Sequence, residues 1–363
     1  MNIDGKPFRT IWYNEADRNV KIIDQTQLPH HLKIATLNSL DDVCHAILEM
    51  LVRGAPLIGA TAAYGIAIAC RENATDDALD MAAMRLLATR PTAVNLRWAV
   101  KRICTLLKTY PLEQREKTAF NFAQELCDED SDVCSRIGDA GVTLIESLYE
   151  KKNTTINILT HCNAGWLATV DWGTAIAPIY KAFNKGIPIH VWVDETRPRN
   201  QGAFLTAWEL NQHGVPHTII PDNTGGHLMQ HGLVDMCIVG TDRTTAHGDV
   251  CNKIGTYLKA LAAFDNNIPF YTASPTSSID WDIYDGLKEI PIEERHHSEV
   301  SHISGLSINN TIEKIKLIPQ DSKVANFGFD VTPARLVTAL ITEFGIYPAT
   351  ASGLSQLKKH LPL

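Results

Sequence analysis

The stretch Ile156-Asn-Ile-Leu-Thr-His-Cys-Asn-Ala-Gly165 joins a short apolar run to a thiol, an amide and a glycine. Short apolar runs of this kind are typical of buried strands. Similar runs recur at Ile189–Val193, His217–Ile220, Met236–Val239 and Phe270–Ala273. Segments with helical patterns lie between them, at Gly173–Lys185, Gly202–His213 and Ile254–Phe264. Strands that alternate with helices predict an α/β fold with a mainly parallel sheet and helices on both faces.

The residues before this region have a different pattern. Phe8–Tyr13 and Val20–Ile23 predict a β-hairpin, and Leu32–Ala35 is a candidate third strand. Helical patterns then dominate. They cover Leu40–Leu51, a segment opened by Pro56 that runs through Cys70, Asp77–Thr89, Val94–Tyr110, Arg115–Cys127 and Cys134–Glu150.

A polar stretch, Lys151–Thr155, separates the two patterns and is the predicted linker. We therefore expect two domains. Residues 1–150 are predicted to form a smaller, mostly helical domain with a short antiparallel sheet. Residues 151–363 are predicted to form an α/β domain that carries most of the active site, because ligands of parallel sheets bind beyond the carboxyl ends of the strands.

Composition narrows the class of function. The 363 residues include 33 Lys or Arg and 41 Asp or Glu, a formal net charge of −8. An acidic chain without a basic run is a poor partner for nucleic acid or anionic membranes, so we expect a small-molecule ligand. The apolar run Gly59–Cys70 is too short to span a membrane, and Met1–Asn14 lacks the core of a signal peptide. Eight cysteines without a C-x-x-C pair are typical of reduced thiols and predict a cytoplasmic protein.

Two side chains that follow predicted strands are candidates for catalysis. Cys162 precedes a glycine-containing turn, where the positive end of a following helix would favour the thiolate. We expect it to act as a base or nucleophile, against the alternative of a small core hydrophobe. Asp242 is either a salt-bridge or cap residue, or an acid kept protonated by an apolar environment.

An anion site is predicted at Arg53-Gly-Ala-Pro56, where an arginine and a glycine open a helix. The alternative is an ordinary helix start with a surface arginine. Lys253, next to Asn252, offers a second positive group. The sequence has no G-x-G-x-x-G and no P-loop pattern, so neither a dinucleotide nor a P-loop triphosphate is indicated. His227 and His231 lack a matched carboxylate, and we predict no metal site.

Several segments, in the same order along nearly the whole chain, resemble the methylthioribose-1-phosphate isomerase family. They are Arg53-Gly-Ala-Pro-Leu-Ile-Gly59, Leu159-Thr-His-Cys-Asn163, Asp194-Glu-Thr-Arg-Pro198 with Gln201-Gly202, Asn252-Lys-Ile-Gly-Thr256 and Phe329-Asp-Val-Thr-Pro333. This family shares its fold with the regulatory subunits of the eukaryotic initiation-factor exchange factor. The resemblance implies a Rossmann-like C-terminal domain and a homodimer. The sequence departs from the family at Thr241, at His247 and at Asn326-Phe-Gly328, which leaves the preferred substrate open.

The resemblance also implies the residues of the site and an activity without a cofactor. Cys162 and Asp242 would be the catalytic pair. The substrate would contact Arg53, Gly54, Ala55, Arg97, Gln201, Asn252 and Lys253. The expected reaction converts 5-methylthioribose 1-phosphate to its ketose in methionine salvage, by acid-assisted ring opening and proton transfer. The alternatives are a hydride shift, 5-deoxyribose 1-phosphate as substrate, and a non-catalytic regulatory binding protein of the same fold.

Overall fold

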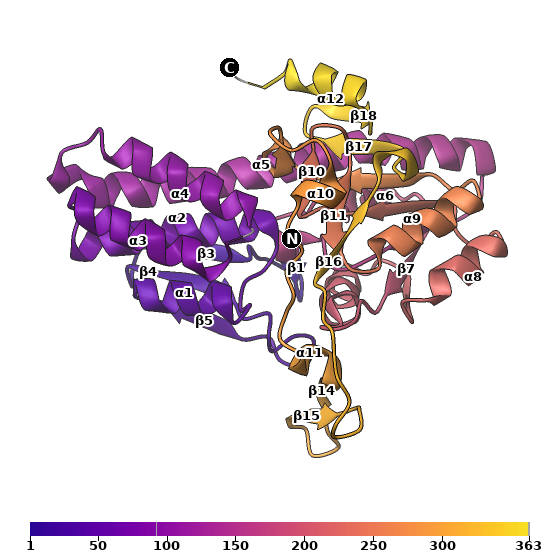
Figure 1. Cartoon of the computed structure of the whole chain (residues 1–363), viewed down its shortest axis with the longest axis horizontal. Helices are drawn as coiled ribbons and strands as arrows, with labels where there is room; N and C mark the ends of the chain where they lie inside the picture. Colours follow the sequence, from indigo (N-terminus) through magenta and orange to yellow (C-terminus); the bar gives the residue numbers. More distant parts are fainter. Residues whose placement is uncertain (92, 362–363) are drawn as a thin grey trace.

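The computed structural model describes residues 1–91 and 93–361. Its N-terminal half is an array of helices beside an antiparallel sheet of order β3-β4-β5 (Figure 1). A short strand pair, β1 (Asn2–Ile3) and β2 (Lys6–Pro7), precedes it. The sheet consists of β3 (Ile11–Asn14), β4 (Asn19–Ile23) and β5 (Ile34–Leu37). The helices are α1 (Leu40–Leu48), α2 (Ala55–Glu72), α3 (Asp76–Thr89), α4 (Val94–Leu107) and α5 (Leu112–Lys152).

Local sequence explains these elements. Val20 and Ile22 of β4 point into the core, whereas Lys21 between them pairs with Thr36 across the sheet. Helix α1 begins at a capping box, in which the Ser39 hydroxyl accepts from the Asp42 amide and the Asp42 carboxylate accepts from the Ser39 amide. The predicted hairpin, third strand and first four helices are confirmed, with ends shifted by a few residues.

A seven-stranded sheet organises the C-terminal half. Its order is β18-β17-β12-β9-β6-β7-β8, and every pairing is parallel except that of β17 with β18. The strands are β6 (Ile156–Thr160), β7 (Ile189–Asp194), β8 (His217–Ile220), β9 (Met236–Val239), β12 (Phe270–Ala273), β17 (Ala339–Thr342) and β18 (Gly345–Pro348). The five predicted strands are confirmed, and β17 and β18 extend the sheet beyond the prediction.

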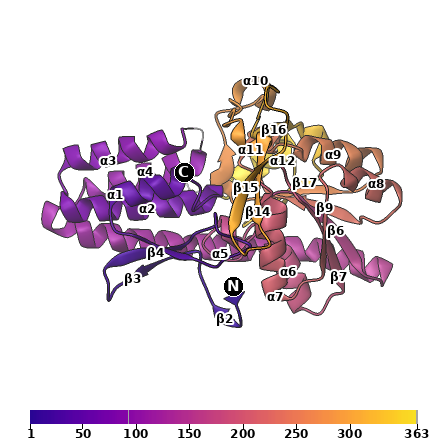
Figure 2. The ribbon, with the colours of Figure 1, turned by 90° about the horizontal axis from the view of Figure 1, so that it is seen from below.

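Helices cover both faces of this sheet (Figures 1 and 2), and strands such as β9 and β17 are buried on both sides. Side chains alternate along a strand, so Ile158 packs into one hydrophobic core and Leu159 into another. The first core receives α6 (Ala177–Asn184), α7 (Ala207–His213) and the C-terminal part of α5. The second receives α8 (Thr224–Gln230), α9 (Thr256–Asp265) and α12 (Ala351–Lys358).

A second, four-stranded sheet of order β13-β10-β11-β16 stands between the helical array and the large sheet. Its strands are β10 (Arg243–Thr245), β11 (Val250–Lys253), β13 (Ile279–Asp280) and β16 (Phe329–Thr332). After α10 (Gly286–Glu289) and α11 (Ser298–Ser301), a hairpin of β14 (His302–Leu306) and β15 (Ile312–Lys316) projects from the body (Figure 1). Within the described residues, no helix combines the length and apolar character that a membrane span requires.

Helix α5 corrects one prediction. We expected two helices, Arg115–Cys127 and Cys134–Glu150, but α5 runs through both without a break. The acidic link between them contains no glycine or proline, and its carboxylates have partners. Asp128 pairs with Arg9 at 2.6 Å, Glu129 with Arg102 at 3.0 Å and Asp132 with Arg136 at 2.9 Å. Neutralisation of the acidic run removes the repulsion that would break the helix.

The same helix takes part in two hydrophobic cores. Its residues up to Cys127 pack with the N-terminal helices, and those from Ile137 onward pack with the large sheet. Gly138 and Gly141 face α6, where a Cβ on Gly141 would lie 2.4 Å from Pro178. Glycine is therefore required for the close packing of α5 on α6.

Asp130 of α5 makes stability depend on pH. Its carboxylate accepts a hydrogen bond from the Val170 amide at 2.7 Å, and burial raises its pKa to about 7. An acid whose pKa is higher in the folded than in the unfolded state destabilises the fold as pH rises from about 4 to about 7. We expect the free energy of unfolding of D130N, which cannot titrate, to fall less across that window than that of the wild type. Urea unfolding at about pH 5 and about pH 8 tests this, and equal losses would contradict it.

Candidate active site

The carboxyl ends of β6 and β9 bring two predicted catalytic residues to one cavity. Cys162 follows β6, and Asp242 lies between β9 and β10. These residues line a cavity with members of the link between α1 and α2, the loop after β7 and the end of β11: Arg53, Gly54, Ala55, Gln201 and Lys253. An adjoining pocket shares Cys162 and Asp242 and adds Asn252. All the predicted site residues except Arg97 therefore surround one space.

Arg97 lies elsewhere. Its side chain is exposed on α4, opposite the buried face formed by Leu96 and Val100, and its guanidinium donates to the Pro91 carbonyl at 3.4 Å. The geometry does not support Arg97 as a substrate contact. Arg90, which our sequence analysis missed, lines the cavity instead. It occupies the link between α3 and α4, as Arg53 occupies the link between α1 and α2. The similar position of the two arginines, each just before a helix, is the sequence feature that could have identified Arg90.

The backbone around Cys162 is held in an uncommon conformation. Cys162 has φ +66° and Thr196, a β-branched residue, has φ +63°. The Cys162 amide donates to the Thr196 hydroxyl at 2.8 Å, and its carbonyl accepts from the Thr206 hydroxyl at 2.7 Å. The thiol lies 3.6 Å from the amide oxygen of Gln201. Strain at a buried cysteine, fixed by several hydrogen bonds, is typical of a functional site.

Burial, not a helix dipole, controls the thiol. We expected a helix after the glycine-containing turn, but Trp166–Ala168 forms only a single 3₁₀ turn. Burial raises the pKa of the Cys162 thiol, the Asp242 carboxylate raises it further, and Arg53 and Lys253 oppose the increase. The expectation that the helix end favours the thiolate is therefore wrong. The positive side chains at the cavity perform that role.

The carboxyl of Asp242 is shifted in the direction that suits an acid. Burial raises its pKa, while Lys253, Arg53 and Arg90 oppose the shift. Burial also lowers the pKa of Lys253, whereas Cys162 and Asp242 raise it. Lys253 donates to the Gly328 carbonyl at 3.0 Å and lies 4.5 Å from the centre of the Phe329 ring. The thiol, the carboxyl and the ammonium group thus influence one another within one cavity.

Arg53 is oriented by a chain of hydrogen bonds. Its guanidinium donates to the side-chain oxygen of Asn163 and, at 2.8 Å, to the Asn163 carbonyl. Asn163 in turn donates to the carboxylate of Glu209, which also accepts from the Trp166 amide and the Tyr180 hydroxyl at 2.8 Å each. Glu209 is fully buried, and burial raises its pKa to about 7. Sequence patterns gave no signal for Glu209, because it lies within a helix.

Two features of the cavity suit a bound anion. Among the described residues, the buried Nε atoms of Arg53 and Arg90 have no hydrogen-bond partner, and buried donors are rarely left unpaired. Gly54 begins α2 with φ +96°, and a Cβ there would lie 2.4 Å from the Ala168 carbonyl oxygen. Only glycine fits this position. The first turn of α2, with its free amides, therefore faces the cavity beside the two guanidinium groups.

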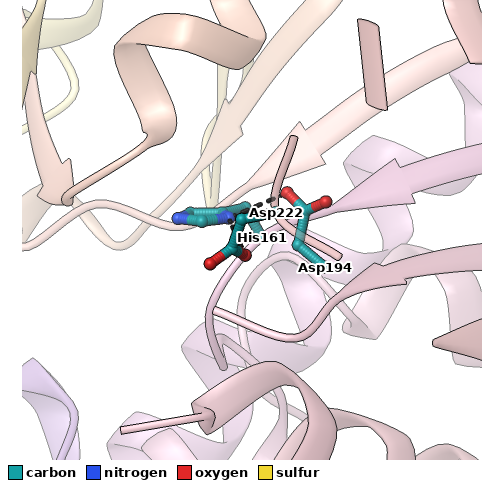
Figure 3. Close-up of side chains that lie close together, drawn as sticks. All are labelled: His161, Asp194 and Asp222. Carbon is teal, nitrogen blue, oxygen red and sulfur yellow. Dashed lines mark hydrogen bonds and ion pairs between the residues drawn. The ribbon is translucent and has the colours of Figure 1, made fainter. Parts of the chain in front are cut away.

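A cluster of His161, Asp194 and Asp222 has the composition of a metal site (Figure 3). Protein donors already occupy it. Asp194 Oδ2 accepts from His161 at 2.8 Å and pairs with Lys259 at 3.2 Å. The Asp222 oxygens accept from the amides of Thr196 and Arg197 at 2.7 Å each. The Lys259 ammonium supplies the positive charge that a metal ion would bring, so the donor set does not fit a cation.

Comparison with known proteins places the chain among relatives of two kinds. The model of the initiation factor 2 subunit family matches residues 51–349. A methylthioribose-1-phosphate isomerase from Paramagnetospirillum magneticum is 60% identical over 357 residues, which cover 98% of this chain and 99% of that one.

The similar solved structures also include both an isomerase and an initiation-factor subunit. The crystal structure of 5-methylthioribose 1-phosphate isomerase from Pyrococcus horikoshii is 38% identical, has a TM-score of 0.82, and aligns over 98% of this chain and 96% of that one. The structure of translation initiation factor eIF-2B, subunit delta, from A. fulgidus is also 38% identical, with a TM-score of 0.77 over 94% and 96% of the chains.

Substitutions of Arg90 and Arg97 are expected to have different effects on anion binding. R90A removes a cavity guanidinium and should weaken the affinity for inorganic phosphate roughly tenfold or more, because a charge-assisted hydrogen bond is lost. R97A should bind phosphate as the wild type does, because Arg97 faces solvent. Titration calorimetry of both variants measures the difference. A loss in R97A, or none in R90A, would contradict the assignment.

Proposed function

This chain belongs to the initiation factor 2 subunit family, and we propose that it is an isomerase that converts 5-methylthioribose 1-phosphate to 5-methylthioribulose 1-phosphate. Relatives about 60% identical over nearly the full length are named methylthioribose-1-phosphate isomerase. The observation that carries the assignment in this chain is the meeting of Cys162 and Asp242 at one cavity with Arg53, Arg90 and Lys253. A regulatory binding protein of the same fold has no need of that combination.

The substrate explains why an acid and a base are both needed. A sugar phosphorylated at its anomeric carbon cannot open freely to an aldehyde, so ordinary isomerisation is blocked. The enzyme has to open the ring while the phosphate stays attached. That step needs a proton for the ring oxygen and a base for the hydrogen on C2.

In the proposed mechanism, the Asp242 carboxyl protonates the ring oxygen as its bond to C1 breaks. The Cys162 thiolate removes the proton from C2, which gives an enol phosphate. The thiol then protonates C1, while the hydroxyl on C2 gives its proton to the Asp242 carboxylate and becomes the ketone. Both side chains return to their starting states. The raised pKa of Asp242 supports its role as acid. Burial raises the pKa of Cys162, and Arg53 and Lys253 limit that rise and so favour the thiolate.

The remaining residues fit the two ends of the substrate. Arg53, Arg90, Lys253 and the first turn of α2 would hold the phosphate and offset its charge. Apolar side chains on the cavity wall would receive the methylthio group: Met50, Ile58, Ile290 and Phe329. Gln201 and Asn252 would contact the sugar. The departures of this sequence from the family at Thr241 and His247 leave 5-deoxyribose 1-phosphate as a second substrate to test.

We also propose a domain organisation, an oligomeric state and a location for this protein. The strand order, which reverses between β6 and β9, supports a Rossmann-like domain at residues 151–363 after a smaller helical domain at residues 1–150. We also propose a homodimer, as the family resemblance implies. Eight free cysteines support a cytoplasmic location.

An assay in deuterated water tests the reaction and its mechanism together. Purified protein should convert 5-methylthioribose 1-phosphate to the ketose, and the product should carry deuterium at C1 because the proton on Cys162 exchanges with solvent. Mass spectrometry and NMR measure the label. Product without label would favour a hydride shift, and absence of product would refute the proposed function. The ratio of kcat/KM for the methylthio and 5-deoxy substrates decides between them.

The roles of the catalytic pair predict a bell-shaped pH dependence of kcat/KM. Activity falls at low pH as Cys162 is protonated and at high pH as Asp242 loses its proton. D242N should be about 10²–10⁴-fold slower, and its remaining activity should rise with pH without the high-pH decline. C162S should be impaired by a similar factor. Stopped-time assays across pH, with circular dichroism to check folding, measure these effects. Near-native turnover in both folded variants would overturn the assignment.

A further inference from the structure

His161, the residue before Cys162, is fully buried and has an acceptor at each ring nitrogen. Nδ1 lies 2.8 Å from Asp194 Oδ2 (Figure 3), and Nε2 lies 2.9 Å from the carbonyl oxygen of Ile254. A carbonyl oxygen only accepts hydrogen bonds, so Nε2 has to carry a proton. The protonation state of the ring then depends on Asp194.

Asp194 accepts from His161 as an ionised carboxylate. Its Oδ2 atom is also 3.2 Å from the Lys259 ammonium, and both side chains are buried. An adjacent ammonium group favours the charged carboxylate. Because an ionised carboxylate has no proton to give, Nδ1 must supply the one in the bond. Both nitrogens of His161 therefore carry protons.

The surroundings balance the resulting charge. Two cations, His161 and Lys259, face two carboxylates, Asp194 of β7 and Asp222 after β8, whose Oδ1 atom lies 4.0 Å from His161 Nδ1. On the side of β16, burial raises the pKa of Asp330, and the charges of His161 and Lys259 oppose that increase. Buried charges are tolerated when they are paired and hydrogen-bonded in this way.

The hydrogen bond to Ile254 joins two segments of the catalytic cavity. His161 precedes Cys162, and Ile254 follows Lys253. The turn after Ile254 passes directly over the imidazole, since a Cβ on Gly255 would lie 3.1 Å from His161 Cε1. Asp330 fixes the far side of this turn by accepting from the amides of Gly255 and Tyr257. The ring is thus held between the end of β6 and the turn that leads into α9.

We propose that His161 positions the Cys162 thiol and the Lys253 ammonium relative to each other through the hydrogen bonds of its two ring nitrogens. It is a positioning residue, because its two ring nitrogens are bonded to Asp194 and Ile254 and it acts through the backbone of its neighbours. It borders the adjoining pocket only, not the cavity lined by Lys253 and Arg90. The charge cluster fixes the ring, and its Nε2–H sets the spacing between the two loops. The expected effect of His161 on catalysis rests on the proposed function. Its contacts in the structure do not.

Two substitutions of His161 distinguish its hydrogen bond to Asp194 from its hydrogen bond to Ile254. In H161N the side-chain amide nitrogen takes the place of Nδ1, so the bond to Asp194 is kept and that to Ile254 is lost. In H161Q the amide nitrogen reaches the place of Nε2, so the bond to Ile254 is kept. H227N, a change on the exposed surface of α8, serves as the control.

The readout is the pH midpoint for alkylation of Cys162 by iodoacetamide, followed by peptide mass spectrometry. Lys253 lowers the pKa of Cys162, so loss of their spacing should move the midpoint upward further in H161N than in H161Q and leave it near wild type in H227N. We also expect kcat to fall roughly 10–100-fold in H161N with a smaller change in KM. Equal midpoints in H161N and wild type, or equal shifts in H161N and H161Q, would overturn the proposal.

A measurement on the unmodified protein covers the case in which H161N fails to fold. Long-range ¹⁵N–¹H NMR of the histidine rings should show a proton on Nε2 of His161, because its partner is the carbonyl oxygen of Ile254. A ring protonated at Nδ1 alone would overturn the proposal. Neither measurement needs substrate, so their outcome is independent of whether the chain proves to be an isomerase.

Discussion

The parallel pairing of β6 with β9 is the constraint on which the site depends. These neighbouring strands lie where the strand order of the large sheet reverses, so their connections leave in opposite directions. A gap opens there beyond the carboxyl ends of the strands. Cys162 and Asp242 meet at that gap, although they are eighty positions apart in the sequence. The helical half then closes it with Arg53 and Arg90, so neither half contains the site alone.

The chemistry of the cavity follows from the burial of a few titratable groups beside positive charges. Burial raises the pKa of both Cys162 and Asp242, and the positive groups nearby limit both shifts. The same surroundings therefore keep the carboxyl available as an acid, while Arg53 and Lys253 limit the rise in the pKa of the thiol. Hydrogen bonds through Asn163 and Glu209 fix the direction of Arg53 behind the cavity. Rigid placement of donors in this way is what stabilises charge that develops during a reaction.

Sequence patterns predicted the parts of the structure that depend on local information. Apolar runs located the five strands of the large sheet, and the rule for strand ends located Cys162 and Asp242. The four-stranded sheet was missed because strands such as Arg243–Thr245 are short and polar and pair with distant segments. The acidic run of α5 pairs with Arg9 and Arg102, which lie far away in the sequence, and the outward position of Arg97 depends on which face of α4 packs inward. Those facts exist only after the chain has folded.

Helix α5 gives the molecule a mechanical property. Its 41 residues form one rod whose first part is embedded in the helical half and whose second part is clamped to α6 through Gly138 and Gly141. The arginines ride on one end of this assembly and the catalytic pair on the other. Because α5 joins the two halves without a break, its continuity limits how far Arg53 and Arg90 can move away from Cys162.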